Sequence, residues 1–170
     1  MAHYEKEMNK LIKGIPGLQG CEVNFPGCQF MASTVNLGPH TVTDFHRDSQ
    51  NLAYGLCCVI PFGNFLYRKG SLLILKELGL ELEVAPGDVV FLPSACITHG
   101  NMLLFYGEME KCYSLTLYTS DSCFSGLLTG VKPRRQRSRW KKRLTARHNG
   151  YVKGWSYHSN IDDILQEYMC

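Results

Sequence analysis

The chain has 170 residues, a formal net charge of +3 and 45% hydrophobic residues, which is enough for one globular domain with a buried core. It has neither an apolar run of the ~20 residues that a membrane helix needs nor a charged-then-apolar leader, so we expect an intracellular monomer without membrane contact. The eight cysteines include no C-x-x-C pair, which disfavours a zinc ribbon, and Cys57, Cys58 and Cys96 are expected to be buried thiols.

The pattern along the chain predicts a mainly β protein with short flanking helices. Residues 3–13 have apolar side chains at helical spacing and predict a short amphipathic helix. Short apolar or alternating runs, separated by turn residues, then predict strands at 30–37, 42–46, 51–60, 70–75, 80–84, 89–93 and 112–118. Strands this short and frequent favour a double-stranded β-helix, which is a jelly-roll or cupin-like fold. We expect it to occupy residues 1–130, followed by a basic segment and C-terminal tail, 131–170, with a possible short helix.

Two histidines and one aspartate suggest the chemistry most directly. Side chains two residues apart on an extended segment point to the same face, so His46 and Asp48 can enter one cavity while Arg47 points away. A second strand then needs only to bring His99 beside them. Two imidazoles and one carboxylate cover one face of an octahedral ion and leave the opposite positions open, which suits non-haem Fe(II) and oxygen activation. A short His-x-Asp match also arises by chance in surface turns.

A wider set of motifs surrounds these residues. In chain order they are Thr34-Val35-Asn36, Thr41-Val42-Thr43, His46-Arg47-Asp48, Asn51-Leu52-Ala53-Tyr54-Gly55, Gly63-Asn64-Phe65, Gly70, Leu78 to Val84, Pro86-Gly87, Pro93-Ser94-Ala95, His99-Gly100-Asn101 and Tyr113-Ser114-Leu115-Thr116. Residues 30–127 thereby resemble the Fe(II)/2-oxoglutarate dioxygenase-like domains of the Tet/JBP type, and more narrowly their fungal, transposon-associated branch. The resemblance implies a double-stranded β-helix in which His46, Asp48 and His99 hold Fe(II) and act in catalysis. It also implies that 2-oxoglutarate chelates the iron through its keto acid end, and that a modified base in DNA is oxidised.

The resemblance has one departure, in the last predicted strand. Family members have an arginine just before the Tyr-Ser pair, where it grips the far carboxylate of 2-oxoglutarate, whereas this chain has Cys112. Lys111 is the first candidate for a substitute cation, although on a regular strand it points to the opposite face. Ser114 shares the face of Cys112, and Asn51 belongs to the matching motifs, so both are candidate cosubstrate contacts. Three explanations of the missing arginine remain open. The chain uses another cation, it uses a different cosubstrate or none, or it is a decayed domain.

The charge of the chain is uneven. Nine of its 18 Lys and Arg residues lie between Lys132 and Arg147, without an acidic residue, which leaves nine against 15 Asp and Glu elsewhere. The candidate nucleic-acid contacts in this segment are Arg134, Arg135, Arg137, Arg139, Trp140, Lys141, Lys142 and Arg143. Arginines suit phosphates and a tryptophan can stack on a base, so we expect nucleic acid, DNA rather than RNA, as partner. The same segment suits a nuclear-import signal, a solvated tail, or a contact with the acidic domain.

The predicted function is therefore a non-haem Fe(II)- and 2-oxoglutarate-dependent oxygenase that oxidises a modified nucleic-acid base, in a nuclear protein. One alternative is a catalytically inactive β-helix domain that binds nucleic acid or a protein. Another is a cupin-like small-molecule oxygenase that does not use 2-oxoglutarate, and Cys112 is the feature that favours it.

Overall fold

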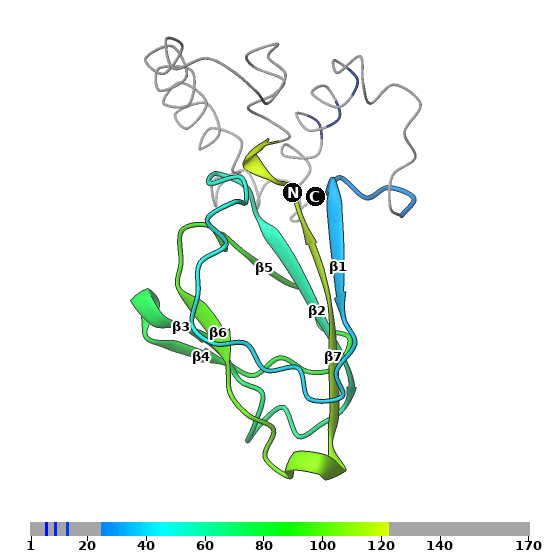
Figure 1. Cartoon of the computed structure of the whole chain (residues 1–170), viewed down its shortest axis with the longest axis vertical. Helices are drawn as coiled ribbons and strands as arrows, with labels where there is room; N and C mark the ends of the chain where they lie inside the picture. The colour runs from blue at the N-terminus through cyan, green and yellow to red at the C-terminus, as the bar shows by residue number, and fades with distance from the viewer. Residues whose placement is uncertain (1–5, 7–8, 10–12, 14–24, 123–170) are drawn as a thin grey trace, which may run out of the picture. The chain divides into compact units, whose positions relative to one another are not determined.

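The computed structural model describes residues 6, 9, 13 and 25–122. The strands of this described part lie in one compact unit, Phe30–Asp121 (Figure 1). Residues 6, 9 and 13 are helical, which agrees with the helix predicted over 3–13. The basic segment, the predicted C-terminal helix and the predicted boundary after residue 130 lie outside the described residues and stay predictions. Within the described residues, no helix is long and apolar enough to cross a membrane.

Two antiparallel sheets form the unit. The larger sheet has the spatial order β1 (Ala32–Asn36), β7 (Lys111–Tyr118), β2 (Cys57–Asn64) and β5 (Val90–Leu92). The smaller has the order β4 (Leu80–Leu82), β3 (Leu73–Leu75) and β6 (His99–Asn101). Two short 3-10 turns, η2 (Lys76–Leu78) and η3 (Gly107–Met109), lie in the connections. The predicted mainly β, jelly-roll-like fold class is confirmed.

Strand β7 carries the register of the larger sheet because it pairs with β1 on one side and with β2 on the other. Its side chains alternate between the two faces of the sheet, as the period of two along a strand requires. The residues of β7 that line the interior cavity are Cys112, Ser114, Thr116 and Tyr118. This cavity wall therefore consists of small polar side chains and one aromatic ring, where an ordinary core strand would place aliphatic residues.

The hydrophobic core joins the two sheets beside the cavity. Leu92 on β5 and Leu75 on β3 are 1% and 7% exposed, and they pack with Cys57 of β2. Cys57 and Cys58 face opposite sides of β2, yet both thiols are buried. Burial, with the Asp48 carboxylate nearby, raises the pKa of the Cys57 thiol to about 12. The prediction of buried thiols is confirmed for Cys57 and Cys58, whereas Cys96 is only partly buried.

Several predicted strand boundaries were wrong. Residues 42–46 form no regular strand; this part of the chain makes isolated bridges at His40 and His46. β2 begins only at Cys57, after a turn at residues 53–54, and it ends at Asn64, beyond the predicted end at residue 60. The late start arises because local hydrogen bonds compete with strand pairing: the Asn51 and Gly55 amides donate to carbonyls three residues earlier.

Candidate metal centre

The side chains of His46, Asp48 and His99 converge in the structure. Their candidate ligand atoms all lie within 4.8 Å of one another. Asp48 Oδ1 is 3.3 Å from His46 Nε2, and Asp48 Oδ2 is 4.0 Å from His99 Nε2. The two imidazole centroids are 4.5 Å apart. The fifty residues between the two parts of the motif thus fold so that three donor atoms surround one point, as the spacing predicted.

Hydrogen bonds fix which nitrogen of each histidine is available. His46 Nδ1 lies 2.8 Å from the Asp44 carbonyl, and His99 Nδ1 lies 2.9 Å from the Ile97 carbonyl. A carbonyl oxygen only accepts hydrogen bonds, so Nδ1 carries the proton in the neutral ring and Nε2 keeps its lone pair. Both Nε2 atoms face Asp48. Metal-binding histidines are typically oriented by such a second hydrogen bond, so the donor set fits a divalent ion.

The backbone brings the two histidines together. His46 and His99 form an isolated antiparallel bridge, in which each amide donates to the other's carbonyl, at 3.0 and 2.9 Å. His99 lies on β6 at the pairing position of Leu75 on β3, and it is 8% exposed. The His46 side chain is 40% exposed, so the centre has one buried and one accessible imidazole. The exposed His46 side leaves the three donor atoms accessible to a ligand.

Asp48 is held both by its backbone and by a neighbouring amide. Its N–H donates to the Ser94 carbonyl at 3.0 Å. Asn51 Nδ2 lies 3.1 Å from Asp48 Oδ2 and 3.1 Å from Ser94 Oγ, and Ser94 is 1% exposed. Asn51, predicted as a cosubstrate contact, thus lines the cavity but also orients the aspartate. The sequence did not single out Ser94 for this role.

Arg47 points away from the three donor atoms, as predicted, and takes part in a surface network. Its guanidinium donates to Thr98 Oγ1 at 2.9 Å and to the Glu77 carboxylate. Glu77 also accepts hydrogen bonds from the amide and hydroxyl of Thr98, at 2.7 and 2.6 Å. The Thr98 and Arg47 hydrogen bonds lower the pKa of Glu77 to about 2. The network ties the segment between His46 and Asp48 to the residue before His99.

Gly100 and Asn101, which the sequence analysis named only as members of a motif, help to position His46. The Asn101 side chain takes the place of part of the strand pairing of residues 41–43: its Oδ1 accepts from the Thr43 amide at 2.7 Å, and its Nδ2 donates to the Thr41 carbonyl at 2.9 Å. Gly100 allows this close approach, because a Cβ at that position would lie 2.8 Å from the Thr43 carbonyl oxygen. The motif His99-Gly100-Asn101 was visible in the sequence. Its positioning role was not, because that role depends on the packing of residues 41–43 against it.

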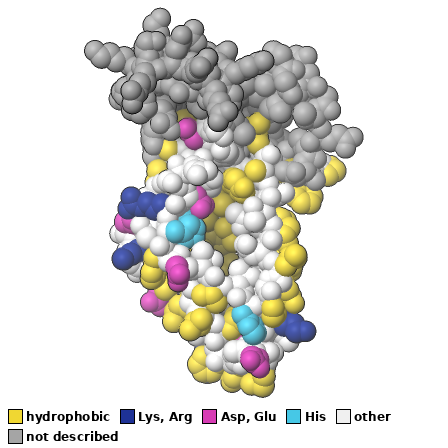
Figure 2. All heavy atoms as spheres, viewed as in Figure 1, with side chains coloured by type: hydrophobic (Ala, Val, Ile, Leu, Met, Phe, Trp, Pro, Cys, Tyr) yellow, Lys and Arg dark blue, Asp and Glu magenta, His cyan; other side chains and the backbone are white. Residues whose placement is uncertain are grey.

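The donor atoms border a cavity of about 710 Å³, within the usual size range of small-molecule sites. Figure 2 shows the hollow, with histidine and acidic side chains at its edge. The lining combines the aliphatic side chains of Val59, Leu73, Val84 and Val90 with the hydroxyl and amide groups of Thr34, Asn36, Ser114, Thr116 and Tyr118. Val59 on β2 pairs with Thr116 on β7, so apolar and polar side chains lie next to each other on the larger sheet. The predicted residues Asn51 and Ser114 therefore belong to the cavity.

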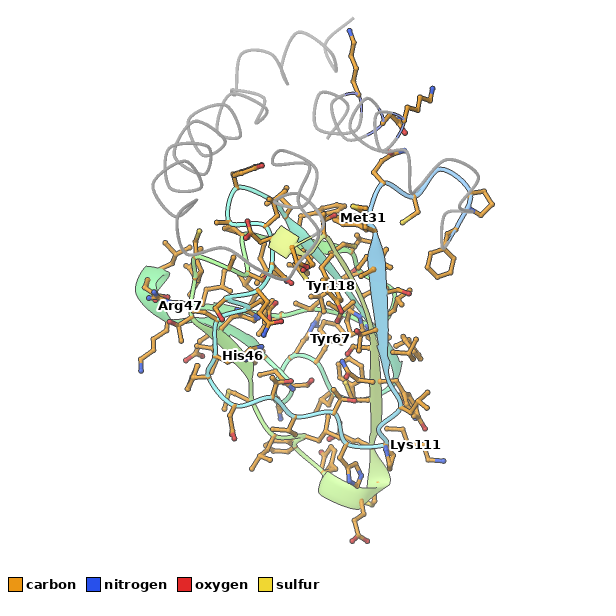
Figure 3. All side chains as sticks on the ribbon, turned by 45° about the horizontal axis from the view of Figure 1, so that its top comes forward. Met31, His46, Arg47, Tyr67, Lys111 and Tyr118 are labelled. Carbon is orange, nitrogen blue, oxygen red and sulfur yellow. The ribbon has the colours of Figure 1, made fainter. Side chains whose placement is uncertain are left out.

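Lys111 does not belong to the cavity. It is exposed and pairs with Asn64 in an unbroken register, so no bulge rotates it toward the face of Cys112. Figure 3 shows Lys111 at the far end of β7 from Tyr118 and well separated from His46. The prediction that Lys111 supplies the cation for a cosubstrate carboxylate does not fit this geometry.

Comparison with known proteins supports the fold. No protein-family model matches the chain, and no curated protein matches it significantly. A search of solved structures finds, among its matches, NgTET1 in complex with 5mC DNA, at a TM-score of 0.52 and 19% sequence identity. The match covers 82% of this chain and 50% of the NgTET1 chain, so this protein spans about half the length of that structure. The chain therefore has a Tet/JBP-like fold, as the resemblance implied.

Proposed function

We propose that this protein is a non-haem Fe(II)-dependent oxygenase of the 2-oxo-acid class, in which His46, Asp48 and His99 hold the iron. The observation that carries the proposal is the convergence of two Nε2 atoms and a carboxylate at the edge of a cavity, with both Nδ1 atoms engaged by carbonyls. Iron bound in this way supplies oxygen activation at its open positions. The Tet/JBP-like fold supports this reaction class, and the fungal, transposon-associated branch remains part of the proposal.

The residues of the chain position the reactants. Asn51 and Ser94 fix the plane of the Asp48 carboxylate, and the bridge between His46 and His99 fixes the distance between the two rings. The aliphatic side chains of the cavity lining limit access of water, while its hydroxyl and amide groups offer hydrogen bonds to a polar ligand. This combination of apolar and hydrogen-bonding side chains suits a heterocyclic base, which has apolar faces and polar edges.

A modified nucleic-acid base is the substrate class that we propose. The structural neighbour was solved with 5mC DNA, which supports DNA as the partner. The basic stretch from Lys132 to Arg147 lies outside the described residues, and we propose that it contacts phosphates and also serves nuclear import. If it binds DNA through phosphates, the affinity must fall steeply as the salt concentration rises. DNA affinity that stays constant in a salt titration would contradict this part of the proposal.

The function is tested by following oxidation of a defined base. Protein loaded with Fe(II) is mixed with O2, a 2-oxo acid and an oligonucleotide that contains 5-methylcytosine, and the nucleosides are analysed by mass spectrometry. We expect a product that gains one oxygen atom, its loss in His99→Ala, and its retention in His40→Ala, because His40 is exposed and lies outside the cavity lining. Product formation in the presence of a chelator would refute the proposal. Absence of product despite bound iron would favour the inactive, binding-only alternative.

A second candidate is an oxygenase for a small molecule that uses no 2-oxo acid. It is favoured by Cys112, because this cavity position holds a neutral thiol in place of a cation. Turnover of a substrate without any added 2-oxo acid would identify this alternative.

A further inference from the structure

The cavity contains a strip of uncharged polar side chains, which we call the neutral strip. Its members are Asn36, Ser71, Cys112, Ser114 and Thr116. Asn36 Nδ2 donates to Ser114 Oγ at 2.8 Å, and Ser71 Oγ lies 3.6 Å from Cys112 Sγ. The contact between Asn36 and Ser114 follows from the strand register, because the two residues are paired across β1 and β7. Burial raises the pKa of the Cys112 thiol, so this side chain carries no charge at neutral pH.

No free cation faces this strip within the described part of the chain. Arg47 is the one Lys or Arg among the described residues that line the cavity, and its guanidinium is bound to Glu77 and Thr98. Lys111 is exposed, on the other face of β7. The far carboxylate of 2-oxoglutarate would therefore meet hydroxyl, thiol and amide groups without a neutralising charge. Taking a charge out of water without a partner is unfavourable, so 2-oxoglutarate fits this cavity poorly.

An uncharged polar group fits the same strip well. A hydroxyl both donates and accepts hydrogen bonds, and Ser114 retains its own proton to donate because it accepts from Asn36. A carboxylate can only accept, whereas an amide offers an acceptor and two donors to such neighbours. The strip thus complements a neutral amide or hydroxyl in both directions of hydrogen bonding.

We infer that the cosubstrate of this centre is a 2-oxo acid with a single carboxylate and an uncharged polar tail, and that the tail lies on the neutral strip. The inference rests on the proposed oxygenase function, since the keto acid end is taken to reach a metal held by His46, Asp48 and His99. It concerns only the opposite end of the molecule.

The test compares two open-chain ligands that differ in the charge of the tail. 2-Oxoglutarate and its 5-methyl ester, which has an uncharged tail and no N–H that could add to its keto group, are titrated by calorimetry into the anaerobic, Fe(II)-loaded full chain. We expect the ester to bind at least about tenfold more tightly, a difference of about 1.4 kcal/mol. Equal or tighter binding of 2-oxoglutarate would overturn the inference while leaving the metal-dependent function intact.

Variants separate the possible causes. Asn36→Lys, on the edge strand β1, and Cys112→Arg each add a cation to the strip and should shift the preference toward 2-oxoglutarate. Lys111→Ala should leave both affinities unchanged, and a selective loss of 2-oxoglutarate binding in it would overturn the inference. If neither ligand binds to iron-loaded protein, the inference fails together with the 2-oxo-acid part of the proposed function. If the wild-type chain binds no iron, the proposed function itself fails.

Discussion

Replacement of Asn51 by alanine isolates the contribution of the residue that orients Asp48. The backbone of Asp48 is fixed independently, because its amide donates to Ser94 and its carbonyl accepts from the Asn51 amide at 2.8 Å. Asn51→Ala therefore removes only the two side-chain hydrogen bonds, each 3.1 Å long, to Asp48 and Ser94. The fold should remain, while the carboxylate gains freedom to rotate.

The expected loss is in metal affinity. Removing a group that orients a metal ligand typically costs about 10–100-fold in affinity, or about 1.4–2.8 kcal/mol. The two lost hydrogen bonds should each contribute about 0.5–1.5 kcal/mol to the free energy of unfolding. Anaerobic calorimetric titration with Fe(II) gives the dissociation constant, and urea unfolding of the metal-free chain gives the stability.

Asn64→Ala is the matched control. Asn64 is an exposed asparagine at the end of β2 and lies outside the cavity lining. Its replacement should leave the metal affinity unchanged. An Asn51→Ala protein that binds Fe(II) as tightly as the wild-type chain, or an equal loss in Asn64→Ala, would refute the orienting role of Asn51.

Two further predictions concern stability. Leu92→Ala should lower the free energy of unfolding, measured by urea titration, by about 2–5 kcal/mol, because Leu92 is 1% exposed and packs against Cys57 and Leu75. As a control, Leu103→Ala should change this free energy by less than about 0.5 kcal/mol, because Leu103 is 73% exposed. Glu77→Gln should lower the melting temperature at pH 7 but not near pH 2. The pKa of Glu77 is about 2 in the folded chain, below its ordinary value of 4.5. The Glu77 carboxylate therefore stabilises the fold above pH 4.5, and this stabilisation is lost as the pH falls through the folded pKa. A pH-independent difference between wild-type and Glu77→Gln melting curves would contradict that linkage.

The convergence of the three candidate metal ligands was predictable from the sequence, because it depends on simple spacing. His46 and Asp48 share a face two residues apart, and a bridge to His99 completes the set. The strands over 112–118 and 89–93 were also predictable, since alternation and β-branched or aromatic residues mark them locally.

The remaining features depend on contacts between distant segments. The segment 42–46 looks like a strand, but the Asn101 side chain takes up the Thr43 amide and the Thr41 carbonyl. The Arg47 network likewise requires Glu77 and Thr98, which are 30 and 51 residues away. Lys111 was predicted as an anchor because it is the nearest cation in sequence, and only the unbroken register of β7 excludes it. None of these outcomes follows from local propensity.

The central claim is that His46, Asp48 and His99 bind one divalent metal ion. Anaerobic titration of the full chain with Fe(II), with the bound metal counted by elemental analysis, tests it most directly. We expect one ion per chain in the wild type and in His40→Ala, and no tightly bound ion in His46→Ala, Asp48→Ala or His99→Ala. Iron that remains bound with unchanged affinity after any of these three replacements would contradict the assignment of the three ligands.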